Sequence, residues 1–125
     1  MSANIDTVMR FVQAWNDRDL EAIVTAFAPN AVYHNMPLEP VVGHASIRAT
    51  IAPWLQASSK IDWKVHHIAE TPAGVVLAER TDYLVVNGKQ IALPIMGTFE
   101  LANGLITAWR DYYDANQYQQ QLPAG

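Results

Sequence analysis

The chain has 125 residues, which is long enough for one folded unit to bury a hydrophobic core without disulfides or metals. Half of the residues are hydrophobic, 16% are charged and the formal net charge is −4, so the composition argues against disorder and against a nucleic-acid partner. There is no cysteine, which excludes disulfides, thiolate metal sites and thiol nucleophiles. We expect a single domain over residues 1–125.

The sequence carries no signal for a membrane. Residues 1–6 contain neither a basic segment nor an apolar one. No apolar run in the chain approaches the length of about 20 residues that a membrane span needs. We therefore expect a cytoplasmic protein without a membrane partner.

Two short helices are predicted at the start of the chain. Apolar residues at helical spacing predict the first over residues 4–16, and Asp19 is a suitable N-cap for a second whose apolar stripe ends at Phe27. A strand over residues 31–36 should follow. Gly43 opens a third predicted helix, which Pro53 should kink or shorten.

From Lys60 onward the hydrophobic period changes to two, which predicts strands. In the first of them Ile61, Trp63, Val65 and His67 share one face. Two Asn-Gly pairs, at residues 87–88 and 103–104, predict hairpin turns that join the later strands. Helices followed by a meander indicate an α+β fold, a curved antiparallel or mixed sheet with the N-terminal helices packed on its concave face.

Charged residues interrupt the apolar faces of two predicted strands. Arg80 and Asp82 share a face with Val76 and Ala78, and Asp111 lies on an apolar face of the last strand. Because a buried charge costs several kcal/mol unless it is paired, these residues need partners or a function. Arg80 and Asp82 alone would be explained most simply as a structural ion pair.

The register of the hairpins decides whether the two carboxylates meet. Two-residue loops at both Asn-Gly turns would put Asp111 opposite Met96 and on the other face of the sheet from Asp82. One odd step must therefore intervene, as a glycine bulge at either turn or a bulge at Pro94. We expect it between Val86 and Met96. With Asp111 inward, the alternation would turn Ile106, Ala108 and Tyr112 outward.

Three segments, at residues 33–43, 79–82 and 104–114, together resemble the limonene-1,2-epoxide hydrolases, which have the nuclear-transport-factor-2-like (SnoaL-like) fold. The resemblance implies hydrolysis of an epoxide to a diol without cofactor or metal. It also implies a homodimer, because family members commonly pair through the exposed sheet face. Matched by motif, the catalytic residues would be Arg80, Asp82, Asp111, Tyr33 and Asn35.

This set of residues suits the reaction on chemical grounds. Opening an epoxide with water needs a base for the water and an acid for the departing oxygen. Two carboxylates in an apolar pocket, with an Arg between them, should hold one proton over a range of pH. By resemblance to the family, Asp111 is the base and Asp82 the acid. Tyr33 and Asn35, two apart on a strand, could hold the water.

Two other functions stay open. An isomerase or cyclase on the same fold would act on a ketosteroid- or polyketide-like substrate, and a non-catalytic module would only bind a small molecule. The isomerase needs no Arg between two carboxylates, which counts against it.

The histidines are spread over different elements, so no metal site is expected. The expected partner is a small apolar epoxide, cyclic or terpene-like.

Overall fold

The computed structural model describes residues 2–122. Within them lie the helices α1 (Ala3–Asn16), α2 (Leu20–Thr25), α3 (His44–Ala57) and α4 (Ala115–Gln121). The strands are β1 (Phe27–Asn35), β2 (Val41–Val42), β3 (Ser58–Glu70), β4 (Val76–Val86), β5 (Lys89–Ala102) and β6 (Leu105–Tyr112). None of these helices is long and apolar enough to cross a membrane.

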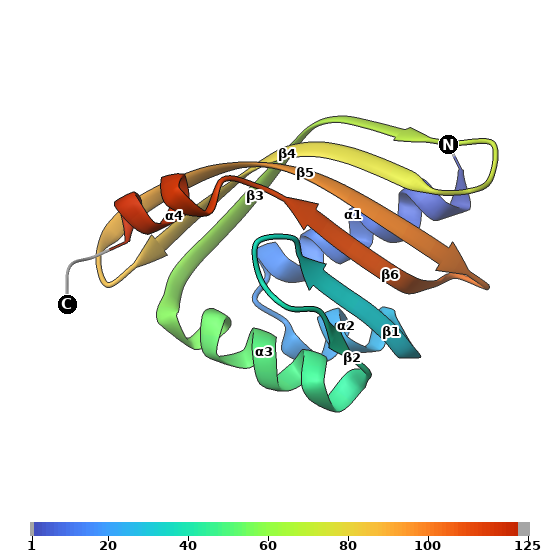
Figure 1. Cartoon of the computed structure of the whole chain (residues 1–125), viewed down its shortest axis with the longest axis horizontal. Coiled ribbons are helices and arrows are strands. Elements are labelled where there is room, and N and C mark those ends of the chain that lie inside the picture. The colour runs from blue at the N-terminus through green and yellow to red at the C-terminus, as the bar shows by residue number, and fades with distance from the viewer. Residues whose placement is uncertain (1, 123–125) are drawn as a thin grey trace.

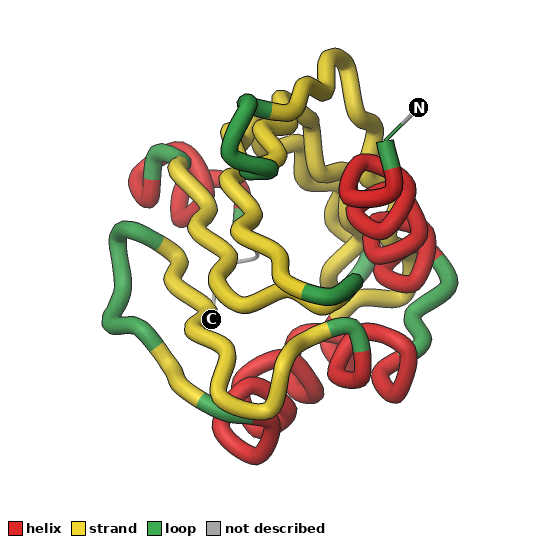
Figure 2. The backbone as a smooth tube through the Cα atoms, turned by 90° about the vertical axis from the view of Figure 1, so that its right-hand side faces the viewer, coloured by secondary structure: helices red, strands yellow, loops and turns green. Residues whose placement is uncertain are grey.

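The strands form one curved sheet in the order β2-β1-β6-β5-β4-β3. Strands β2 and β3 are its two edges, so the sheet stays open, and Figure 2 shows how strongly it bends. Helices α1, α2 and α3 lie beneath the concave side, whereas α4 lies at the end of β6 (Figure 1). The α+β prediction, with helices on the concave face, is confirmed.

The first two helices begin where the sequence predicts. Ser2 caps α1 by accepting a hydrogen bond from Ile5 N (3.0 Å), and Asp19 caps α2 by accepting one from Ala22 N (3.1 Å). The apolar stripe of α1 is buried against the sheet and forms the core with residues from α2, α3 and the inner strand faces. Burial of this stripe, more than local propensity, stabilises so short a helix.

In this region one predicted helix end is wrong, and Pro53 does not end the third helix. Helix α2 ends at Thr25, and Phe27 already belongs to β1, which pairs with β6 from Phe27 opposite Ile106. Sheet pairing therefore overrides the helical spacing of Phe27. Helix α3 runs on to Ala57 despite Pro53, because buried Ile51 and Leu55 hold the turns on either side of the exposed proline.

The odd step in register exists, but the predicted position is wrong. The β4–β5 pairing runs without a break from Val76 opposite Phe99 to Val86 opposite Lys89. The shift lies in the next hairpin, where Glu100 pairs with Ala108 but Leu101 pairs with Ile106. Thr107 is thus the extra residue of a β-bulge. The bulge turns Ile106 inward, so that it is fully buried rather than outward as the alternation predicts.

A second bulge reorients β3. Its pairing with β4 shifts between Val65 and His67, so His66 is the extra residue. As a result Ile68 packs against the core and His67 is exposed, contrary to the predicted alternation. Both bulges increase the local bend of the sheet, as unpaired extra residues do.

Candidate active site

A buried Arg80 joins two buried carboxylates on the concave face of the sheet. Its Nε and Nη2 donate to the two oxygens of Asp82 at 2.7 and 3.1 Å. Its Nη1 and Nη2 donate to the two oxygens of Asp111 at 3.0 and 2.5 Å. Side-chain exposure is 1% for Arg80, 6% for Asp82 and 3% for Asp111, so water does not screen these ion pairs. The sequence prediction that these three residues meet is confirmed.

Two tryptophans interact with the buried charges and partly replace the water that these charges lose on folding. The Trp63 ring lies 4.3 Å from the carbon of the guanidinium, within the range of a cation–π interaction. Asp111 receives a further hydrogen bond from the indole N–H of Trp109, at 2.8 Å. Removing one partner of such a buried pair typically costs about 3–5 kcal/mol, because the other charge is left uncompensated.

Strand β1 brings Tyr33 and Asn35 to the same place. It runs parallel to β6, with Tyr33 opposite Trp109 and Asn35 opposite Asp111. Asn35 Nδ2 donates to Tyr33 Oη at 2.9 Å, and both side chains are buried. The backbone N–H of Met36 also donates to the Asp111 carbonyl at 2.9 Å, which fixes the end of β1 against β6. All five sequence-predicted site residues therefore lie together.

Burial shifts the protonation equilibria of the site. It raises the pKa of Asp82 to about 6, although the Arg80 guanidinium pulls in the opposite direction. For Arg80 itself burial lowers the pKa, but the charges of Asp111 and Asp82 outweigh it, so the pKa is raised and the side chain stays a cation. Burial and the charge of Asp111 raise the pKa of Tyr33 well above its usual value, so the phenol keeps its proton. The site can thus hold a neutral carboxyl group beside permanent donors.

Sequence reasoning missed two residues that shape this site. Trp109 is fully buried and touches Asp111 through its indole N–H. Gly97 pairs with Asp111, and a Cβ there would come within 2.8 Å of Arg80 Nη1 and 2.9 Å of Asp111 Oδ1. The signals were available: Trp109 lies two residues before Asp111, hence on its face, and an isolated glycine within a strand often marks a close approach of other groups.

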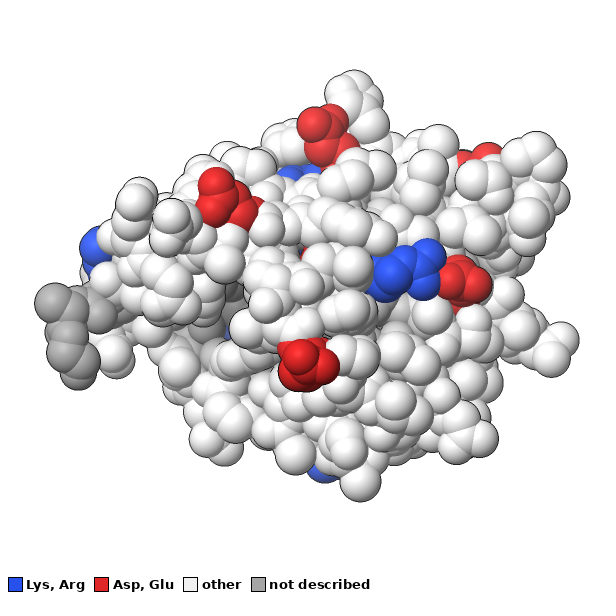
Figure 3. All heavy atoms as spheres, in the orientation of Figure 1, with Lys and Arg blue, Asp and Glu red and all other residues white. Residues whose placement is uncertain are grey.

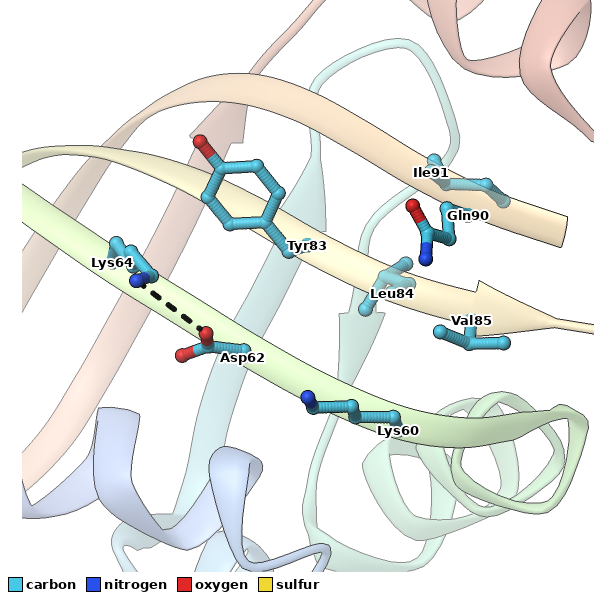
Figure 4. A pocket seen from close by; sticks show the side chains of 8 residues that line it. All are labelled: Lys60, Asp62, Lys64, Tyr83, Leu84, Val85, Gln90 and Ile91. Carbon is cyan, nitrogen blue, oxygen red and sulfur yellow. Dashed lines mark ion pairs between the residues drawn. The ribbon is translucent and has the colours of Figure 1, made fainter.

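Outside this site, the described surface groups no comparable set of charged or reactive side chains. A hollow of about 340 Å³ lies on the convex face over β3, β4 and β5, where Asp62 pairs with exposed Lys64 at 3.7 Å (Figure 4). Such an exposed pair contributes little. On the face of the molecule that Figure 3 shows, the Lys and Arg side chains lie apart from one another and form no concentrated patch of positive charge. Within residues 2–122 no group of His, Asp and Glu side chains is arranged to hold a metal ion.

Two solved structures have a fold similar to that of this chain. The solved structure of an M. tuberculosis LEH-like epoxide hydrolase has a TM-score of 0.84 and 28% identity, and the match covers 96% of this chain and 89% of that one. An NTF2-like protein of unknown function from Burkholderia pseudomallei K96243 has a TM-score of 0.87 at 20% identity, over 99% of this chain and all of the other, which shows the fold alone.

Two sequence comparisons give the family. The chain is 32% identical over 107 residues to Epoxide hydrolase EphG of Mycobacterium tuberculosis (strain H37Rv), a match that covers 86% of this chain and 70% of that protein. Residues 2–123 match the family described as limonene-1,2-epoxide hydrolase catalytic domain. The chain therefore belongs to the limonene-1,2-epoxide hydrolase family.

Proposed function

We propose that this protein hydrolyses small apolar epoxides to vicinal diols by direct addition of water, and that residues 1–125 act as one catalytic domain. The observation that carries the proposal is the buried Arg80, which donates to both oxygens of Asp82 and both oxygens of Asp111. This arrangement brings a potential acid and a potential base close together in a site from which bulk water is excluded.

In the proposed reaction Asp111 takes a proton from a water molecule while the water oxygen attacks one epoxide carbon. Tyr33 and Asn35 orient that water. Asn35 Nδ2 donates to Tyr33 Oη, so the Tyr33 O–H and the side-chain oxygen Oδ1 of Asn35 remain for hydrogen bonds to the water. The carbon–oxygen bond breaks as Asp82 gives its proton to the departing oxygen. The enzyme is reset when the proton on Asp111 returns to Asp82. No cofactor enters these steps.

The protonation of Asp82 supports its role as acid. A carboxyl group with a pKa of about 6 is largely neutral in mildly acidic solution, whereas an ordinary aspartate is ionised there. The raised pKa results first from burial, which is also what excludes competing water from the reacting atoms.

The apolar surroundings support an apolar substrate. Beside the triad, Leu93 lies opposite Asp82 and Ile95 lies opposite Arg80 on β5. Further along, Ile91 lies opposite Leu84. The three β5 residues are buried but lie outside the main core cluster, so they provide a separate apolar surface next to the proposed acid. A compact cyclic or terpene-like oxide matches such a surface.

The test is a screen of cyclic and aliphatic epoxides with chiral analysis of the diols, run beside a ketosteroid isomerisation assay. We expect diol formation and no isomerisation. Turnover of the ketosteroid alone would replace the proposal with an isomerase, and silence in both assays would favour a binding module.

Oxygen-18 labelling separates direct hydrolysis from a covalent ester route. In a single turnover with enzyme in excess in ¹⁸O water, one diol oxygen should carry the label and Asp111 should carry none, because the solvent molecule itself attacks carbon. Mass spectrometry of the diol and of the peptide containing Asp111 measures both. Unlabelled diol in the first turnover, with label then appearing in an aspartate, would contradict direct hydrolysis.

We also propose that the protein is a homodimer that pairs through the convex face of the sheet. On that face Tyr83, Met96 and Tyr112 are 41%, 40% and 44% exposed, and Met96 lies opposite Tyr112. We expect a dimer in sedimentation velocity at micromolar concentration. Met96→Lys should shift it toward monomer, because a charge would be buried at the interface. The control Met9→Lys, at a 38% exposed methionine on α1, should remain dimeric.

A monomeric wild-type protein in that experiment would refute the dimer. Loss of the dimer in both variants would instead place the interface elsewhere.

A further inference from the structure

The two carboxylates that bind Arg80 do not have equal surroundings. Within residues 2–122, Asp82 accepts two side-chain hydrogen bonds, both from Arg80. Asp111 accepts two from Arg80 and a third from the indole N–H of Trp109, at 2.8 Å. A neutral donor aimed at a carboxylate favours its ionised form. The third donor therefore distinguishes the two members of the pair.

Trp109 also supports a second residue of the site. Its ring stacks on the Tyr33 ring with centroids 4.3 Å apart and planes within 10° of parallel. The indole is fully buried among Phe11, Phe27 and Phe99, so its position is held from several sides. Asp111 and Tyr33, both proposed to contact the attacking water, thus rest on one rigid side chain.

We propose that Trp109 is a positioning residue that sets the direction of proton transfer, by holding Asp111 as the ionised partner and Tyr33 at a fixed place beside it. The inference rests on the proposed hydrolase function. Trp109 does not touch the reacting atoms, so it acts through Asp111 and Tyr33 and not as a catalytic residue itself.

The charged and titratable groups around Asp111 come from β4, from β1 and from the residue that follows β6. Arg80 and Asp82 face it from β4. Tyr33 faces it from β1, and Tyr113 follows β6; burial and the charge of Asp111 raise the pKa of both phenols, so they stay neutral in mildly acidic and neutral solution. Changes in the acidic limb of the pH profile therefore report on the carboxylate pair.

A matched pair of variants tests the role of the N–H group. Trp109→Phe keeps a ring to stack on Tyr33 but removes the donor. Trp15→Phe is the control, because Trp15 is equally buried but its indole N–H has no hydrogen-bond partner among the described residues. Both variants lose similar volume from one aromatic cluster, in which the Trp15 and Trp109 rings lie 5.9 Å apart.

For Trp109→Phe we expect kcat to fall about 10- to 100-fold with KM nearly unchanged, which is the range for loss of one hydrogen bond to a charged group. The acidic limb of kcat/KM should move to higher pH, because the carboxylate pair loses one of the donors that stabilise its negative charge. Trp15→Phe should change neither quantity beyond the effect of lower stability. Equal kinetics and equal pH profiles in the two variants would overturn the inference.

A measurement on the wild-type protein needs no substrate and no altered core. In a ¹⁵N-labelled sample the four tryptophans give four indole N–H signals, and the two variants assign those of Trp15 and Trp109. The Trp109 signal should move with pH as the carboxylate pair gains a proton, and the Trp15 signal should not. A Trp109 signal as insensitive to pH as that of Trp15 would refute the inference. Absence of epoxide turnover by wild type would refute only the proposed function.

Discussion

Asp111→Asn and Asp82→Asn should each lower kcat/KM by about 10³-fold or more, since each removes one of the two groups that move a proton in the reaction. Asparagine keeps the shape of the side chain, but it can neither take a proton from water nor give one to the departing oxygen. The double variant should lose little more than either single one, because the two groups act as a unit. Steady-state hydrolysis of an epoxide identified in the screen measures all three.

The control for charge removal is Asp62→Asn. Asp62 pairs with Lys64 at 3.7 Å on the exposed convex face, so its replacement should leave turnover near that of wild type. Tyr33→Phe should cost less than either triad change, because Asn35 and Asp111 still contact the water. Near-wild-type turnover of a folded Asp111→Asn or Asp82→Asn protein would contradict the role assigned to that residue.

Thermal unfolding at several pH values shows whether the Asp82→Asn protein is folded. The pKa of Asp82 also predicts how its stability, compared with that of wild type, should change with pH. The pKa of Asp82 is raised in the folded protein, so its favourable contribution to stability is present in acid and is lost as pH rises through about 6. Asparagine cannot ionise and escapes this loss. The difference in unfolding free energy between the Asp82→Asn protein and wild type should therefore shift in favour of the variant as pH rises from about 4 to about 6.

Gly97→Ala should abolish most activity although the added group is a single methyl. Its Cβ would lie 2.8 Å from Arg80 Nη1, 2.9 Å from Asp111 Oδ1 and 3.3 Å from the Phe99 ring, all in buried surroundings. Arg80 or Asp111 must then shift, and a displacement of about 1 Å at a reacting group can cost about 10²-fold in rate. Measured kcat/KM should fall by at least that factor.

Gly88→Ala separates this effect from a general loss of stability. Gly88 has φ +78° and no atom within 4 Å of an added Cβ, so alanine there strains only the hairpin turn. Both variants should unfold at lower temperature than wild type, but only Gly97→Ala should lose activity. If Gly97→Ala kept wild-type kcat/KM, close packing of Gly97 against the triad would not be needed for function.

The charged residues at the centre of the candidate site and most of the local structure could be predicted from the sequence. Arg80, Asp82 and Asp111 stand out because charges on apolar strand faces need partners. Asn87-Gly88 and Asn103-Gly104 form the predicted tight hairpin turns, with positive φ at all four residues. These features depend on residues close in sequence, which is why they can be predicted from it.

How these groups meet depends on long-range pairing that the sequence does not reveal. The parallel pairing that sets Asn35 opposite Asp111 joins segments at opposite ends of the chain, and no local pattern encodes it. The bulge at Thr107 likewise depends on how β6 packs over the core, where burial of both Ile106 and Trp109 requires one residue to leave the alternation. Long-range packing competes with local preference at such positions, and burying two large apolar side chains together outweighs an unbroken ladder.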